Sequence, residues 1–216
     1  MPWYSSLLSF SNSDEEETLG RFLLDVLINS AVIIIMFSVV QYLVAAPFQV
    51  VGHSMVNTLQ DGEYIIVSKL DYLFSDPQRG NIIVFHPPEV KKDYYIKRII
   101  GIPGDSVRLK GGNVIVNGQK LEENYLKEGL KTCLAAYMQD CANDDKVYKV
   151  PEGKYFVLGD NRSGSSDSRA WFTDDNKPDS FVDKDQIQGK TRVVVFPPRS
   201  IRLIPETKVF EGVATK

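Results

Sequence analysis

The chain of 216 residues has few of the side chains that dedicated metal sites use. It contains only two cysteines and two histidines, and no CxxC, HExxH or His-rich segment occurs. Zinc sites need several such ligands at short spacings. An excess of positive charge is also absent, because 25 Lys and Arg stand against 28 Asp and Glu, a net charge of −3. We therefore expect no metal, no cofactor and no nucleic-acid partner, since duplex-binding proteins show a basic excess or stripe.

Charged side chains are also missing from a long segment near the N-terminus. None occurs between Asp25 and Asp61, and residues 26–46 form a run of 21 residues with only four polar side chains. A helix of about 20 residues spans the hydrocarbon core of a bilayer. A buried core helix and a cleaved signal peptide are the alternatives. However, the run is long for a signal peptide, and Pro47 directly follows its small residues. We predict an uncleaved transmembrane anchor at 22–46.

The cations on the two sides of this segment indicate its orientation. Arg21 lies just before the anchor, and the first cation after it is Lys69. Lys and Arg close to a span tend to remain on the cytoplasmic side. We therefore expect residues 1–21 to be a cytoplasmic tail and residues 47–216 to form an extracytoplasmic domain. This predicts a single-pass protein of the plasma membrane, in contact with the lipid bilayer.

The pattern of a long amphipathic helix is absent after residue 47. Seven short runs rich in Val, Ile and Tyr are instead separated by turn sequences such as Asp-Gly, Pro-Gly-Asp and Asn-Gly. This pattern is typical of antiparallel strands. We predict a mainly β domain, built on an antiparallel sheet, with strands at 64–70, 81–85, 94–100, 106–110, 113–118, 154–159 and 192–196.

Residues 119–150 are polar and poor in strand pattern, and we predict an inserted loop or cap at 111–150. The segment contains both cysteines, Cys133 and Cys141, eight positions apart. Nearby cysteines in a loop pair in an oxidising compartment and stay reduced in the cytoplasm. With the orientation given above, we expect a disulfide between them.

Two residues are candidates for a nucleophile and its base. Ser54 follows His53, but adjacent side chains of an extended chain point to opposite faces. No GxSxG motif is present, which leaves a Ser-His-Asp triad open without supporting it. Lys97 and Arg98 lie in a strand-like run, so one of these two cations is expected to face apolar surroundings. Burial makes a lysine easier to deprotonate, and Ser–Lys pairs are a known way to activate a nucleophile.

The segment 159–169, GDNRSGSSDSR, follows an apolar strand and is dense in small and charged residues. It is either a plain hydrophilic loop or a rigid network of carboxylate–guanidinium pairs. In the second case one of its hydroxyls could orient a neutral amine. The residues alone leave open whether this segment meets Ser54 and Lys97.

Taken together, these segments resemble the bacterial type I signal peptidases, membrane-anchored serine proteases that remove signal peptides. GHSMVNTL is similar to their nucleophile box, SMxPTL, and RGNIIVF to an RGDIVVF-type strand. YIKRIIGIPGD is similar to the lysine box, KRxxGxPGD, and GDNRSGSSDSR to GDNRxxSxDSR. Two positions depart from the family. Asn57 replaces the usual proline, and Gly52 stands where some members carry a serine that helps to form the oxyanion hole.

The resemblance implies a signal-peptidase fold and cleavage of exported preproteins after small residues at −1 and −3. It implies Ser54 as nucleophile and Lys97 as general base, with shallow apolar pockets that touch Met55 and Ile96. The implied partners are the signal peptides of preproteins, close to the secretion translocon. A catalytically weak or inactive relative, acting as a membrane-tethered binding module, is the alternative, and Asn57 is the residue that favours it.

The resemblance also implies supporting residues in the segment 159–169. Ser165 matches the family serine that hydrogen-bonds the lysine amine. Asp167 and Arg169 match a family ion pair that stiffens the site. Asp160 and Arg162 match two further supporting residues of the family.

Overall fold

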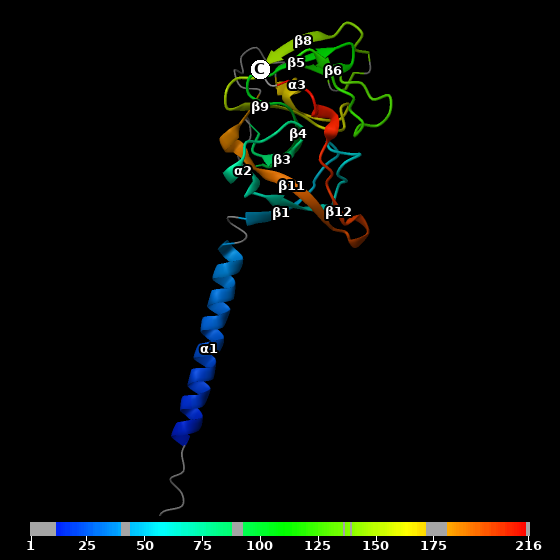
Figure 1. Cartoon of the computed structure of the whole chain (residues 1–216). Coiled ribbons are helices and arrows are strands. Elements are labelled where there is room, and N and C mark those ends of the chain that lie inside the picture. Colours follow the sequence, from blue (N-terminus) through cyan, green and yellow to red (C-terminus); the bar gives the residue numbers. More distant parts are fainter. Residues whose placement is uncertain are drawn as a thin grey trace, which may run out of the picture. The chain divides into compact units, whose positions relative to one another are not determined.

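The computed structural model describes residues 12–39, 44–87, 93–135, 137–138, 140–171 and 181–214. The chain divides into two compact units, Met1–Val44 and Ala45–Lys216 (Figure 1).

The first unit contains one long helix, α1 (Asn12–Val39). Its apolar stretch, Leu19–Val39, has 21 residues and none of it is buried inside the protein, and it is long and apolar enough to cross a membrane. At 1.5 Å per residue it is about 31 Å long, close to the thickness of the hydrocarbon core. Ala45 and Ala46, which hydropathy assigns to the anchor, lie instead in a strand of the second unit. Hydropathy alone does not separate the end of a span from a small apolar strand.

The second unit is built on an eight-stranded antiparallel sheet. In order of hydrogen-bonded neighbours, its strands are β1 (Ala45–Gln49), β2 (Tyr64–Ser68), β11 (Ile187–Phe196), β3 (Ile82–Phe85), β4 (Tyr95–Gly101), β9 (Lys154–Leu158) and β10 (Val182–Asp183), and β12 (Arg202–Leu203) pairs with β11. Register shifts interrupt β11 against β2 and β3, and β4 against β9. Such bulges bend and twist a sheet, and here the sheet curls until side chains of β1 approach the start of β4.

A second antiparallel sheet lies at one end of this unit (Figure 1, green). Its order is β7 (Gln119–Lys120), β6 (Asn113–Val116), β5 (Ser106–Lys110) and β8 (Asp145–Lys149). We expect residues 119–150 to be a loop or cap poor in strands, but β7 and β8 both lie within this segment. Only Tyr148 of the five side chains of β8 is buried, so the apolar alternation that marks a strand is missing. The remaining helices, α2 (Asp71–Phe74) and α3 (Ser168–Trp171), are short.

Three clusters of buried apolar side chains form the core, and one of them joins the two sheets. One of them packs Met55 and Leu59, from the loop between β1 and β2, against side chains of the main sheet such as Ile65 and Val67. The loop that carries Ser54 is thereby fixed to the core by its own neighbours. The prediction of a mainly β domain with one N-terminal apolar helix is confirmed.

Candidate active site

Ser54 lies at the start of a tight turn between β1 and β2. The next residue, Met55, is buried, and its carbonyl accepts hydrogen bonds from the backbone N–H groups of Thr58 (3.0 Å) and Leu59 (2.8 Å). Because the turn is closed by its backbone and anchored by apolar burial, it holds the partly exposed Ser54 at the surface of the core.

Lys97 reaches this serine from strand β4. Its Nζ lies 2.8 Å from Ser54 Oγ and 2.9 Å from the carbonyl oxygen of Ile96. The prediction that only one of the adjacent cations is buried is wrong, since Lys97 is 3% exposed and Arg98 is 2% exposed. Other parts of the protein cover both faces of the sheet at this point. Although Lys97 and Arg98 point to opposite faces, neither side chain therefore faces water.

The two cations differ in their counter-charges. The Arg98 guanidinium forms a bidentate pair with Asp160, at 2.9 and 2.7 Å. Within the part of the chain that the structure describes, no carboxylate forms a salt bridge with Lys97. Burial lowers the pKa of the Lys97 amine to about 8, although the charges of Asp167 and Asp160 oppose the shift. A substantial fraction of Lys97 is therefore neutral near pH 8 and able to accept a proton.

The segment 159–169 packs directly against the nucleophile turn. The backbone N–H of Asn161 donates to the carbonyl of Ser54 at 2.9 Å, and its side-chain amide donates to the carbonyl of His53 at 3.0 Å. A Cβ atom placed on Gly159 would lie 2.5 Å from the Ser54 carbonyl oxygen. Only glycine fits such a close approach of two backbones. The structure thus brings together the three segments that the sequence singles out.

Two buried ion pairs stiffen this segment. Asp167 pairs with Arg169 at 2.8 Å and accepts the backbone N–H of Gly159 at 3.0 Å. Burial raises the pKa of the Asp167 carboxyl, but Arg169 and the Gly159 N–H outweigh it and hold the pKa below its usual value. Asp160 pairs with Arg98 and also accepts the hydroxyl of Thr58, which ties the segment to the nucleophile turn.

Ser165 differs from its expected role. The residue is buried, but its hydroxyl has no hydrogen-bond partner among the described residues. The hydroxyl packs against Gly159, whereas the Lys97 amine is directed to Ser54 and to the Ile96 carbonyl. The expected bond between Ser165 and the lysine amine is therefore absent from this conformation.

Sequence reasoning missed the contribution of the cap (residues 111–150). Arg162 is fully buried and donates to both carboxylate oxygens of Glu123, to the Tyr125 hydroxyl and to the Thr132 hydroxyl. The ring of Tyr125 also lies 4.0 Å from the Arg98 guanidinium carbon, a cation–π contact. These partners are distant in sequence from the segment 159–169, and no local motif marks them. The cap thus supplies the counter-charge and further polar contacts for Arg162, and an aromatic contact for Arg98.

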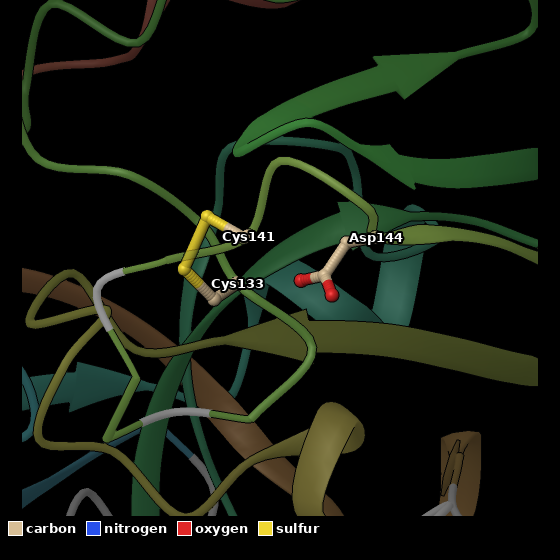
Figure 2. Close-up of side chains that lie close together, drawn as sticks. All are labelled: Cys133, Cys141 and Asp144. Atoms are coloured by element: carbon tan, nitrogen blue, oxygen red, sulfur yellow. A yellow bond between two sulfur atoms is a disulfide. The ribbon is translucent and has the colours of Figure 1, made fainter.

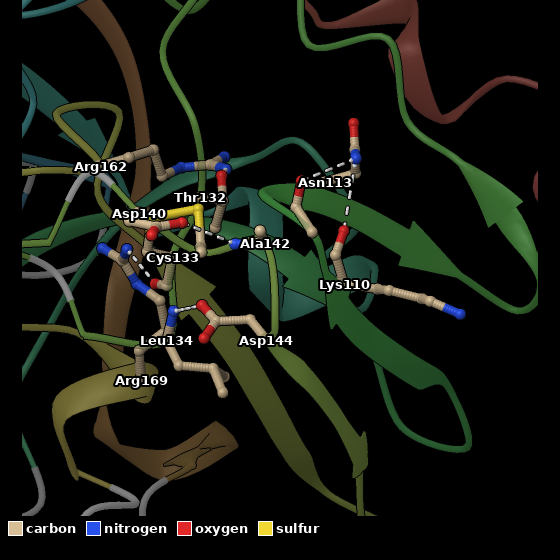
Figure 3. Close-up of a disulfide and its surroundings, with 12 residues drawn as sticks. Lys110, Asn113, Thr132, Cys133, Leu134, Asp140, Ala142, Asp144, Arg162 and Arg169 are labelled. Atoms are coloured by element: carbon tan, nitrogen blue, oxygen red, sulfur yellow. Dashed lines mark hydrogen bonds between the residues drawn. A yellow bond between two sulfur atoms is a disulfide. The ribbon is translucent and has the colours of Figure 1, made fainter.

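The cysteines hold the part of the cap that touches these arginines. Cys133 and Cys141 form a disulfide (Figures 2 and 3). The carbonyl of Cys133 accepts a hydrogen bond from Arg169 at 3.0 Å, and the neighbouring Leu134 N–H donates to Asp144 at 2.7 Å (Figure 3). The sulfurs lie within 4.8 Å of an Asp144 oxygen (Figure 2). Disulfide sulfurs offer no thiolate to a metal ion, so we interpret Cys133, Cys141 and Asp144 as a structural group that stabilises the cap.

A groove of about 510 Å³ opens beside the Ser54–Lys97 pair. One wall is the chain from Phe48 to Met55, and the other begins at Asp93 and ends at Lys97. Both Met55 and Ile96 line it. The first wall continues the outer strand β1, which pairs only with β2 among the described strands.

Known proteins are similar to this chain in sequence over most of its length. A family model described as signal peptidase, peptidase S26, matches residues 23–196. Signal peptidase IB of Staphylococcus aureus strain Mu50 is 38% identical over 182 residues, which cover 81% of this chain and 90% of that protein. The chain belongs to the signal peptidase family, peptidase S26.

Other relatives carry the same description. Signal peptidase I of Bacillus licheniformis is 40% identical over 156 residues, which cover 72% of this chain and 79% of that protein. A crystal structure of a signal peptidase I from Enterococcus faecalis V583 has 30% sequence identity and a TM-score of 0.40, covering 54% of this chain and 97% of that chain. Family membership makes the protein a serine endopeptidase that removes signal peptides. Its one N-terminal apolar helix fits a membrane-anchored enzyme.

Proposed function

We propose that the enzyme cuts signal peptides by a Ser54 nucleophile and a Lys97 general base, after small residues at −1 and −3. The observation that carries this proposal is the 2.8 Å contact between Lys97 Nζ and Ser54 Oγ at a buried lysine. Nucleophile and base need this hydrogen-bond distance, and the base needs a pKa close to the working pH. Burial of the lysine provides the second condition.

The dyad performs the reaction in two halves. Ser54 Oγ attacks the carbonyl carbon of the −1 residue while neutral Lys97 accepts the hydroxyl proton. The tetrahedral intermediate then expels the amine of the mature protein, which takes that proton from Lys97 and leaves an acyl group on Ser54. Lys97 next removes a proton from water, whose oxygen attacks the acyl carbon. Collapse of the second intermediate returns the proton to Ser54 and releases the signal peptide.

The oxyanion of each intermediate needs preorganised donors. The backbone N–H of Ser54 lies at the nucleophile itself and is the donor that we assign. The backbone N–H of Gly52 already donates to Asp61 Oδ1 at 2.7 Å, so this group is occupied in the structure. Asp61 thereby fixes the backbone two residues before the nucleophile.

Two strand edges provide a place for an extended substrate. Strand β9 pairs with β4 from Arg98 onward, whereas Tyr95–Lys97 pair only with β3 among the described strands. This edge of β4 and the end of β1 both line the groove. A peptide added between them would form main-chain hydrogen bonds and direct alternate side chains toward Met55 and Ile96. This supports small residues at −1 and −3.

The proposal also includes the location and orientation of the enzyme in the cell. We assign residues 1–21 to the cytoplasm, the part of helix α1 after Arg21 to the plasma membrane lipid and residues 47–216 to the extracytoplasmic face, where exported preproteins leave the secretion translocon. The single Arg21 before the span, and the absence of Lys and Arg between it and Lys69, support this orientation. The disulfide in the cap supports an oxidising compartment for the domain.

A cleavage assay tests the dyad. The detergent-solubilised full chain is incubated with a preprotein that carries an Ala-x-Ala site, and mass spectrometry maps any new N-terminus. We expect cleavage after the −1 alanine, and a loss of at least about 10³-fold in Ser54→Ala and in Lys97→Ala. Lys149→Ala, an exposed lysine of β8, serves as the matched control with full activity. An active Lys97→Ala enzyme would remove lysine from the mechanism.

A further inference from the structure

Three aromatic side chains meet at the end of the groove that lies away from the dyad. The Tyr94 ring contacts the Phe48 ring edge-on, with centroids 5.0 Å apart, and lies 4.3 Å from the His86 ring. The His86 Nδ1 is 3.0 Å from the Asp93 carbonyl oxygen, which fixes the chain just before Tyr94. Phe48 and Tyr94 line the same groove as Ser54. The proposed mechanism uses none of these rings.

The strand register places Tyr94 relative to the dyad. Ile96 lies opposite Val84 and Tyr95 opposite Phe85, so Tyr94 is the next position along and shares a face with Ile96. Two residues of a strand span about 7 Å. The alternate side chains of an extended substrate have the same spacing. In the proposed function, the −1 and −3 side chains lie beside Ile96, close to the dyad. Tyr94 lies two residues farther from the dyad along the same strand, and so it faces a substrate position closer to the N-terminus.

The chemistry of this end of the groove selects an apolar group. The Phe48 and Tyr94 rings present apolar surface, and Tyr94 is still 47% exposed, so it has area left to bury. The exposed Asp93 lines the same end and would repel an acidic side chain. Signal peptides carry their apolar segment upstream of the small-residue site, which is the direction in which Tyr94 lies.

We propose that Phe48 and Tyr94 form a subsite for a large apolar side chain at position −5 of the substrate. The subsite rests on the proposed function, because the position is counted from cleavage at Ser54. It adds a third specificity determinant to the small residues at −1 and −3. The ring pair gains by burying apolar surface of the substrate, and its contact with His86 holds the Tyr94 ring in place.

A peptide series with the detergent-solubilised full chain tests this subsite. Peptides with one Ala-x-Ala site differ only at −5, which is Leu, Phe, Ser or Asp, and a second Leu/Ser pair differs only at +3. We expect kcat/KM about tenfold higher for Leu or Phe than for Ser at −5, lowest for Asp, and a ratio near one at +3. Each variant enzyme is measured with the same peptides.

Variants of Tyr94 test whether the aromatic rings cause the preference at position −5. Tyr94→Ala is expected to reduce the Leu-to-Ser ratio at −5 to about two or less, whereas Tyr94→Phe keeps the ring and the ratio. Tyr64→Ala is the matched control, since the Tyr64 ring contacts Phe196 and does not line the groove. A parent enzyme with no preference at −5, a preference at +3 instead, or a ratio unchanged in Tyr94→Ala would each overturn the subsite.

The same series separates the two proposals. An Asp at −1 should stop cleavage by the parent and by Tyr94→Phe. If Asp at −1 stops cleavage while the residue at −5 has no effect on kcat/KM, the dyad stands and the subsite is wrong. If no peptide of the series is cut by a folded parent, the proposed cleavage specificity fails and the subsite fails with it.

Discussion

In the proposed mechanism, the protonation state of Lys97 decides whether Ser54 can be activated. Burial lowers its pKa to about 8, and only the neutral amine can accept the Ser54 proton. We expect kcat/KM to increase with pH through about 8 and then to level off, because the base is protonated below this value and neutral above it. The measurement is a peptide-cleavage profile from pH 6 to 10. An acid limb at the ordinary lysine pKa of about 10.4, or a flat profile, would contradict a buried lysine base.

Asn57 gives a second prediction at this scale. It has φ = +97°, in the region that asparagine and glycine tolerate, whereas proline is fixed near −65°. The family's proline therefore does not fit this backbone. We expect Asn57→Pro to lower the free energy of unfolding by about 2 kcal/mol and to reduce cleavage. Asn57→Gly should change stability by less than about 1 kcal/mol.

Thermal unfolding and the peptide assay, run side by side on both Asn57 variants, provide the measurement. A more active Asn57→Pro enzyme would show that the turn adopts the negative φ of the family, and that asparagine is the less suitable residue here.

Sequence reasoning found the proposed nucleophile and base more easily than the residues packed around them. Ser54 and Lys97 lie in local motifs that a reader of the chain can see. The burial of both Lys97 and Arg98 could not be predicted from strand alternation, because it depends on cover from both sides of the sheet. The role of Glu123 could not be predicted either, since its partner Arg162 lies 39 positions away.

At the scale of elements, strands rich in Val, Ile and Tyr were predictable, whereas strands with mostly exposed or polar side chains were not. The runs at 64–70, 81–85 and 94–100 became β2, β3 and β4. Strand β8 was missed because four of its five side chains are exposed. The first half of β11 was missed because it contains Gln, Gly, Lys and Thr, whose strand conformation depends on pairing with β2 and β3.

The cap gives a prediction at this same scale. Glu123 is 9% exposed and neutralises the fully buried Arg162. Glu123→Gln would leave that guanidinium without its counter-charge, and we expect a loss of about 3 kcal/mol in the free energy of unfolding. Cleavage should fall as well, because Arg162 also holds the Gly159 carbonyl (3.0 Å) beside the nucleophile turn.

Urea unfolding of the full chain in detergent measures this loss. Asp145→Asn is the matched control: it removes an acid that pairs with Arg108 on the exposed surface of the second sheet, where Asp145 is 40% exposed. That variant should keep the unfolding midpoint and the activity of the parent. Equal effects of the two substitutions would show that the cap does not support the site.

At the scale of the whole molecule, the substrate, the helix and the disulfide constrain one another. Signal peptides emerge on the far side of the membrane from their synthesis, and the proposed orientation puts the groove on that side. In the proposed orientation, the apolar stretch of α1 crosses the lipid once, with its Arg21 end toward the cytoplasm. A disulfide in the cap persists only where the compartment is oxidising. All three agree on one orientation.

This orientation is the last prediction. In a background of Cys133→Ser and Cys141→Ser, which removes both native cysteines, a single cysteine is placed either at exposed Glu128 in the cap or at Ser13 before the span. We expect a membrane-impermeant maleimide to label Glu128→Cys in intact cells and Ser13→Cys only after permeabilisation. The reverse pattern would place the groove in the cytoplasm. Lys and Arg near a span set its direction, so Arg21→Glu should increase the fraction of inverted chains in the same assay.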